Sequence, residues 1–135
     1  MNRNLIIAVA FTVSAAVTLI AATDQDHVKW MKSVQQVCGN LKKGIEAKDA
    51  EAAAKDAKAL VGSFKTVGDF YTDRNIPDAV KISKDAEAAA GDVESAVAAK
   101  DFEKAAASFK SLMGTCGACH KVHREKNEDG TFKIK

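Results

Sequence analysis

Two cysteines and a histidine near the end of the chain carry the clearest chemical signal, in the stretch Cys116-Gly117-Ala118-Cys119-His120. A C-x-x-C-H stretch is the attachment motif for haem c. The two thiols, one helical turn apart, can add to the two vinyl groups of one haem. The histidine that follows can then bind the iron as its proximal ligand. The motif therefore predicts one covalent haem c, attached through Cys116 and Cys119, with His120 on the iron.

Two other uses of paired cysteines have less support in the sequence. A structural zinc site needs about four ligands, and the only further cysteine is the isolated Cys38. A thioredoxin-like redox pair is expected beside a βαβ unit, whereas no strand pattern is visible along this chain. The odd number of cysteines argues against a pure disulfide framework. Cys38 itself is best interpreted as a buried small apolar residue, with an intermolecular disulfide as the alternative.

Length and composition limit the fold class. The chain has 135 residues, which allows one domain at most. It is rich in alanine and lysine and has a single proline, Pro77, which favours a mostly helical protein. The formal net charge is only +2. No basic stripe with interleaved aromatic residues is present, so the sequence gives no indication of nucleic-acid binding.

Residues 1–22 have the pattern of an export signal. Arg3 precedes an apolar run, and the small residues Ala21 and Ala22 stand before a polar stretch, which predicts cleavage after Ala22. An uncleaved membrane anchor is the alternative, because the run approaches the roughly 18–20 residues that span a bilayer. Cleavage would remove Arg3 alone among the charged residues and leave a chain with no stable membrane insertion. We therefore predict a periplasmic bacterial protein, which agrees with a haem attached outside the cytoplasm.

Apolar residues recur at steps of three and four through most of the remaining chain, the pattern of amphipathic helices. The first such stripe contains Val28, Met31, Val34, Cys38, Leu41 and Ile45. Short connections between long helices imply antiparallel neighbours. The prediction is an all-α, up-down-up-down antiparallel four-helix bundle over residues 23–125. Its first three helices are expected at about 24–47, 50–71 and 77–99, and the fourth is expected to contain Phe102 to His123.

Local signals mark the helix starts and the end of the domain. Asp49 and Asp101 are suited to cap the second and fourth helices, and Pro77 suits the first turn of the third. Residues 126–135 are expected to form an exposed tail with a turn at Asp129-Gly130.

The predicted export signal, the four helices and the position of C-x-x-C-H in the last helix together resemble the class II c-type cytochromes, the cytochrome c′ group. The longer stretch from Cys116 to Arg124 adds to this resemblance, because the family typically has an aromatic residue and then arginine after the haem histidine. His123 stands at the aromatic position, which is a departure from the family pattern. The resemblance covers about residues 24–125. It implies a haem-binding four-helix bundle, with Arg124 near a haem propionate.

The resemblance also indicates which residue faces the iron from the distal side. It places a residue of the first helix there, and Met31 lies within about two positions of that place. Met113 lies three residues before Cys116 on the haem-bearing helix and cannot reach the distal face. A core role for Met31 and ligation by His27 are the alternatives, although a histidine near a helix start is more often exposed to solvent. His123 is expected to contact a propionate or the surface.

With His120 and Met31 both bound, the iron would be six-coordinate. The predicted function is then one-electron transfer between redox proteins rather than enzymatic catalysis. The alternative is a five-coordinate haem that binds NO or CO at the distal face. A peroxidase-like enzyme has only His27 as a candidate acid–base group. Lys110 and Lys121 would be available to steer an acidic partner, and a homodimer formed through the first two helices, including Ala52 to Ala54, is left open.

Overall fold

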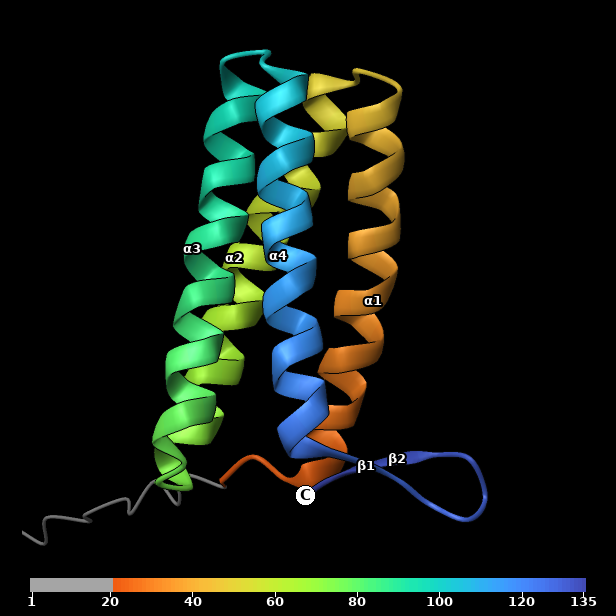
Figure 1. Ribbon diagram of the computed structural model, residues 1–135, viewed down its shortest axis with the longest axis vertical. Coiled ribbons are helices and arrows are strands. Elements are labelled where there is room, and N and C mark those ends of the chain that lie inside the picture. Colours follow the sequence, from red (N-terminus) through yellow and green to blue (C-terminus); the bar gives the residue numbers. More distant parts are fainter. Residues whose placement is uncertain (1–20) are drawn as a thin grey trace, which may run out of the picture.

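The computed structural model describes residues 21–135 and shows a mostly helical protein (Figure 1). Its elements are four helices and two short strands: α1 (Asp24–Glu46), α2 (Ala50–Asp73), α3 (Pro77–Ala98), α4 (Phe102–His123), β1 (Arg124–Lys126) and β2 (Phe132–Ile134). The predicted export signal falls almost entirely on residues 1–20, outside the described part. Within residues 21–135, no helix is both long and apolar enough to cross a membrane.

The four helices pack against one another. Short connections at one end of the molecule join α1 to α2 and α3 to α4, while the α2–α3 connection lies at the other end (Figure 1). α3 packs against both α2 and α4, whereas α1 packs mainly against α2. This arrangement is compatible with the predicted up-down-up-down bundle.

Local side-chain chemistry sets where the helices begin. The carboxylate of Asp49 accepts a hydrogen bond from the backbone N–H of Ala52 at 3.0 Å. The carboxylate of Asp101 accepts one from the backbone N–H of Lys104 at 3.0 Å. Both caps satisfy backbone donors that the first helical turn leaves without partners. The predicted caps are confirmed, as is Pro77 at the start of α3.

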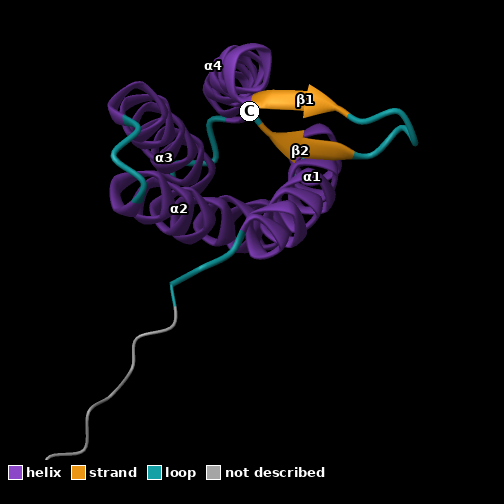
Figure 2. Ribbon diagram, turned by 90° about the horizontal axis from the view of Figure 1, so that it is seen from below, coloured by secondary structure: helices purple, strands orange, loops and turns teal. Residues whose placement is uncertain are grey.

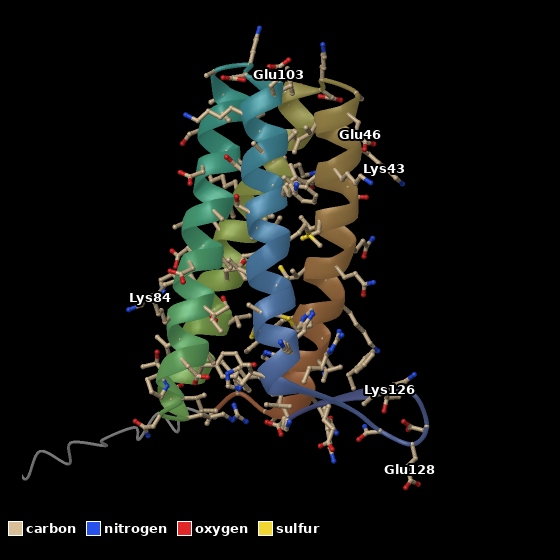
Figure 3. The ribbon with its side chains drawn as sticks, viewed as in Figure 1. Lys43, Glu46, Lys84, Glu103, Lys126 and Glu128 are labelled. Carbon is tan, nitrogen blue, oxygen red and sulfur yellow. The ribbon has the colours of Figure 1, made fainter. Side chains whose placement is uncertain are left out.

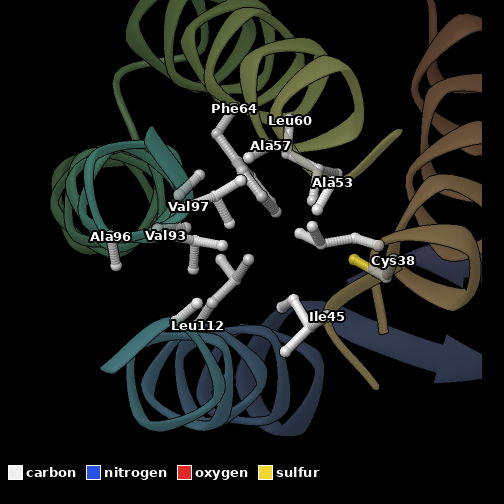
Figure 4. Close-up of a cluster of buried hydrophobic side chains, with 14 of the residues drawn as sticks. Cys38, Ile45, Ala53, Ala57, Leu60, Phe64, Val93, Ala96, Val97 and Leu112 are labelled. Carbon is white, nitrogen blue, oxygen red and sulfur yellow. The ribbon is translucent and has the colours of Figure 1, made fainter. Parts of the chain in front are cut away.

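The core combines a few large side chains with many alanines. Leu60, Val97 and Leu112 are fully buried and meet between α2, α3 and α4 (Figure 4). α1 comes close to α2 at Gly44, where an added Cβ would lie 3.2 Å from the Cβ of Ala53. Ala53 is fully buried, so it is not part of an exposed surface between two copies of the chain.

The C-terminal segment differs from the prediction. The sequence showed no strand pattern, but β1 and β2 pair antiparallel, with Glu125 opposite Lys133. The expected turn at Asp129-Gly130 is confirmed, and Gly130 has a φ of 84°. Most of the segment is exposed as predicted, although Ile134 packs against the bundle. The resulting hairpin lies beside α4 and α1 (Figure 2).

Candidate functional site

A cavity of about 1120 Å³ opens between α1 and α4 and is lined largely by apolar side chains. This volume exceeds the ~300–1,000 Å³ typical of small-molecule sites. Cys116, Cys119 and His120 line it from α4, and Met31 and His27 line it from α1. The fold therefore brings the predicted haem residues Cys116, Cys119, His120 and Met31, together with the alternative ligand His27, to one cavity. The sulfur atoms drawn in yellow lie along the boundary between these two helices (Figure 3).

The α4 side of the cavity presents two free thiols and an imidazole, all half-buried. Burial raises the pKa of both Cys116 and Cys119, and the nearby Tyr71 hydroxyl partly offsets this for Cys119. Burial, followed by the positive charge of Arg124, lowers the pKa of His120. The neutral imidazole, which is the form that binds a metal ion, is thereby favoured.

The α1 side presents Met31, which is half-buried and packs against both buried clusters of the bundle. Met113 also lines the cavity, but from α4, the helix that carries His120, and its side chain is 45% exposed. Of the two methionines in the described residues, Met31 is thus the one on the opposite wall.

His27 is buried, contrary to the expectation of an exposed histidine at a helix start. Its side chain is 7% exposed, and its ring centroid lies 4.8 Å from that of Phe70 and 5.3 Å from that of Tyr71. Burial, followed by the positive charge of Arg74, lowers the pKa of His27 to about 4. Within residues 21–135, its Nε2 is the one buried side-chain nitrogen or oxygen without a hydrogen-bond partner. Such an atom costs about 1–3 kcal/mol, which a polar or metal partner in the cavity would relieve.

His123 and Arg124 occupy places that the sequence did not reveal. His123 was expected at a propionate or at the surface. It is buried, so the expectation of a surface position is wrong. Its Nε2 lies 2.9 Å from Oδ2 of Asp78, which ties the end of α4 to the start of α3. His123 also lines the cavity, and a propionate contact stays a prediction. The guanidinium of Arg124 lies 4.1 Å from the ring centroid of Phe132. Both Arg124 and Phe132 line the cavity, and a propionate contact of Arg124 stays a prediction.

One further residue, Cys38, lies where the sequence predicted. Cys38 is buried and also lines the cavity. Burial raises the pKa of its thiol to about 12, with a smaller contribution from Cys116, so Cys38 is a protonated, apolar side chain here. Trp30 packs on the neighbouring helix, with its ring centroid 5.8 Å from that of Phe70.

Comparison with models of known protein families finds no match, and comparison with curated protein sequences finds no significant similarity. The resemblance to class II c-type cytochromes therefore rests on the motif and on the order of the elements.

The residues present fit a haem c. The cavity offers two thiols at the attachment spacing, an imidazole one residue further along, largely apolar walls and the unpartnered nitrogen of His27. In the described part of the chain, no three His, Cys, Asp or Glu side chains gather into a metal-binding cluster. A haem iron takes only one or two axial ligands from the protein, so such a cluster is not needed.

Proposed function

We propose that this protein is an exported, periplasmic one-electron carrier with one covalent haem c in an antiparallel, up-down-up-down four-helix bundle. The observation that supports this most is the cavity, which has Cys116, Cys119 and His120 on the α4 wall and Met31 on the α1 wall. Haem c, when bound, supplies an iron that alternates between Fe(III) and Fe(II).

Each of the four side chains would have its own role in holding the haem. Cys116 and Cys119 would hold the group through thioether bonds, and His120 would bind the iron from α4. Met31 would bind it from α1, and its thioether would favour the reduced state. No coordination position would then remain for a substrate, so the protein would transfer electrons between redox proteins without acting as an enzyme.

Absorption spectra of the purified holoprotein, reduced and oxidised, with and without CO, test this proposal. We expect a sharp split spectrum when reduced, a weak far-red sulfur-to-iron band when oxidised, and no response to CO. Met31→Ala should lose the sulfur band and gain a response to CO, because it opens the distal position. Met113→Ala is the matched control and should retain the wild-type spectra, because Met113 lies on α4 and is largely exposed.

The same experiment separates the alternatives. A broad high-spin wild-type spectrum that changes with CO would refute Met31 ligation and favour a five-coordinate protein that binds NO or CO. If His27→Leu, and not Met31→Ala, becomes sensitive to CO, the iron is bound by two histidines. An exported protein without any haem absorption would refute the whole proposal.

A further inference from the structure

The C-terminal hairpin crosses from one wall of the cavity to the other. β1 continues directly from the end of α4, and β2 returns beside α1. Viewed along the helices, the two strands lie between α4 and α1 (Figure 2). Residues 130–134 of the hairpin line the cavity itself. The hairpin is thus part of the cavity wall, and it also connects the helix that carries His120 with the helix that carries Met31.

The hairpin is attached at the α4 end by a backbone hydrogen bond. The N–H of Lys135, the residue after β2, donates to the carbonyl oxygen of His123 at 3.0 Å. His123 lies three residues after His120, and its Nε2 is 2.9 Å from Oδ2 of Asp78 on α3. The end of the chain is therefore held to the helix that carries the predicted haem motif, and the end of that helix is held to α3.

Contacts within the hairpin keep its two strands together. The guanidinium of Arg124 in β1 lies 4.1 Å from the ring centroid of Phe132 in β2. In the turn, the carboxylate of Asp129 accepts hydrogen bonds from the backbone N–H and the hydroxyl of Thr131, at 2.9 and 2.6 Å. An isolated two-stranded hairpin is nevertheless only marginally stable in water. Its position therefore depends on what it packs against.

Ile134 is the side chain through which the hairpin packs on the bundle. It is the one residue of the two strands that is not exposed. Its side chain packs against a buried cluster formed by Val67, Phe70, Tyr71 and Ala79. Met31 packs against the same cluster from α1. The hairpin and the predicted distal ligand are thus held by the same group of buried side chains.

We propose that the hairpin is a strap across the cavity that keeps Met31 on the haem iron, with Ile134 as the positioning residue. The inference rests on the proposed function, because Met31 has an iron to bind only if the cavity holds haem. Burial of Ile134 holds β2 beside α1, while β1 is a continuation of α4, so the hairpin restricts how far the two walls separate. Loss of the Ile134 contact would release α1 from the hairpin, and Met31 would leave the iron in a larger fraction of molecules.

Ile134→Glu tests the strap, because a carboxylate is costly to bury against the apolar cluster. The matched control is Val122→Glu, a similar change at an α4 position that is 49% exposed and does not line the cavity. Ferrous Ile134→Glu should bind CO with an apparent affinity at least about tenfold above that of the wild type and the control, because CO takes the position that Met31 leaves.

Two further readouts report on Met31 itself. In Ile134→Glu the far-red sulfur-to-iron band should weaken, and the midpoint potential should fall, because the thioether favours the reduced state. Ile134→Leu keeps the apolar contact and should retain the wild-type spectra and potential.

A measurement without haem separates the strap from the proposed function. In a Cys116→Ala/Cys119→Ala background, Ile134→Glu should speed the hydrogen exchange of backbone amides in residues 28–34 at least about tenfold, because α1 opens more often. Val122→Glu should leave this exchange unchanged. If Ile134→Glu does not fold, Ile134→Ala removes the same contact more mildly, and the same changes are expected in the same directions.

Other results overturn the strap. An unchanged CO affinity, with or without faster exchange, would show that the hairpin does not position Met31. Equal effects of Ile134→Glu and Val122→Glu would show that the added charge acts without regard to the contact. A wild-type protein without haem absorption refutes the proposed function, whereas unchanged exchange in the haem-free background refutes the strap alone.

Discussion

Acidification should weaken the fold through His27, because this histidine is buried as a neutral ring. Burial, and then the charge of Arg74, lowers its pKa from 6.5 to about 4 in the folded protein. The unfolded chain keeps the ordinary value, so it binds the proton more readily between these two pH values. The neutral ring therefore contributes fully to the free energy of unfolding above pH 6.5, and this contribution is lost as the pH falls toward 4. At about 1.4 kcal/mol per pKa unit, the gap amounts to about 3 kcal/mol.

Urea unfolding followed by circular dichroism, at several pH values from neutral to about 4, measures this effect. The free energy of unfolding of the wild type is compared with that of His27→Leu at each pH, so that contributions from the carboxylates cancel. The wild type should lose about 3 kcal/mol relative to this variant over the range. The same comparison in a Cys116→Ala/Cys119→Ala background, which cannot form thioether bonds, separates the burial of His27 from any contact with haem.

A matched control and a clear contrary result complete this test. Gln36→Leu also introduces leucine on α1, but at an exposed position, and its unfolding free energy should follow that of the wild type at every pH. A constant difference between the wild type and His27→Leu in both backgrounds would refute the reasoning. It would mean that His27 is not held as a neutral ring against Phe70 and Tyr71.

Two further predictions concern the packing of α1. Gly44→Ala should destabilise the fold by ~1–3 kcal/mol, because the new methyl would lie 3.2 Å from the Cβ and backbone nitrogen of Ala53. In Gly39→Ala, the new methyl would have no atom within 4 Å, so this variant should stabilise the helix by ~0.5–1 kcal/mol. Urea unfolding measures both free-energy changes. Equal effects of the two substitutions would contradict the close approach at Gly44. Burial raises the pKa of the Cys38 thiol to about 12. This thiol should therefore resist iodoacetamide in the folded protein and react after unfolding. Fast labelling of the folded protein would show that the thiol is accessible.

Most helix boundaries could be predicted because they depend on nearby residues. The second helix was expected to start at residue 50 and the third at residue 77, and α2 and α3 begin there. Capping by Asp49 and the fixed φ of Pro77 operate within one helical turn, so a single sequence contains the whole signal. The predicted helix ends differ from the observed ones by one or two residues, since no comparable capping residue marks them.

The C-terminal hairpin could not be predicted because its strands are too short. β1 and β2 have three residues each, below the four to eight over which alternation becomes visible. The Asp129-Gly130 pair did indicate the turn. What the sequence could not show is that Ile134 packs against the bundle, because that contact depends on residues far away in the chain.

His27 shows how the burial of a residue is underestimated from sequence. It lies four residues before Met31, on the same apolar stripe, and this spacing was the available signal. Its position in the first turn of a helix favoured solvent exposure instead. The decisive partners are Phe70 and Tyr71, which come from the far end of α2 and are not linked to His27 by any local pattern.

The cavity lies between α1 and α4 because these helices are fixed to the rest of the bundle near their ends. Near one end of α1, Gly44 brings the helix close to Ala53 of α2. At the other end of the bundle, His123 joins α4 to Asp78 of α3, while the hairpin packs against α1. Between these anchors, the cavity is lined by largely apolar side chains from α1 and α4. A haem bound there would complete the core and would stabilise the folded state by its preference for that state. Loading of the redox group and stability of the bundle would then depend on the same side chains.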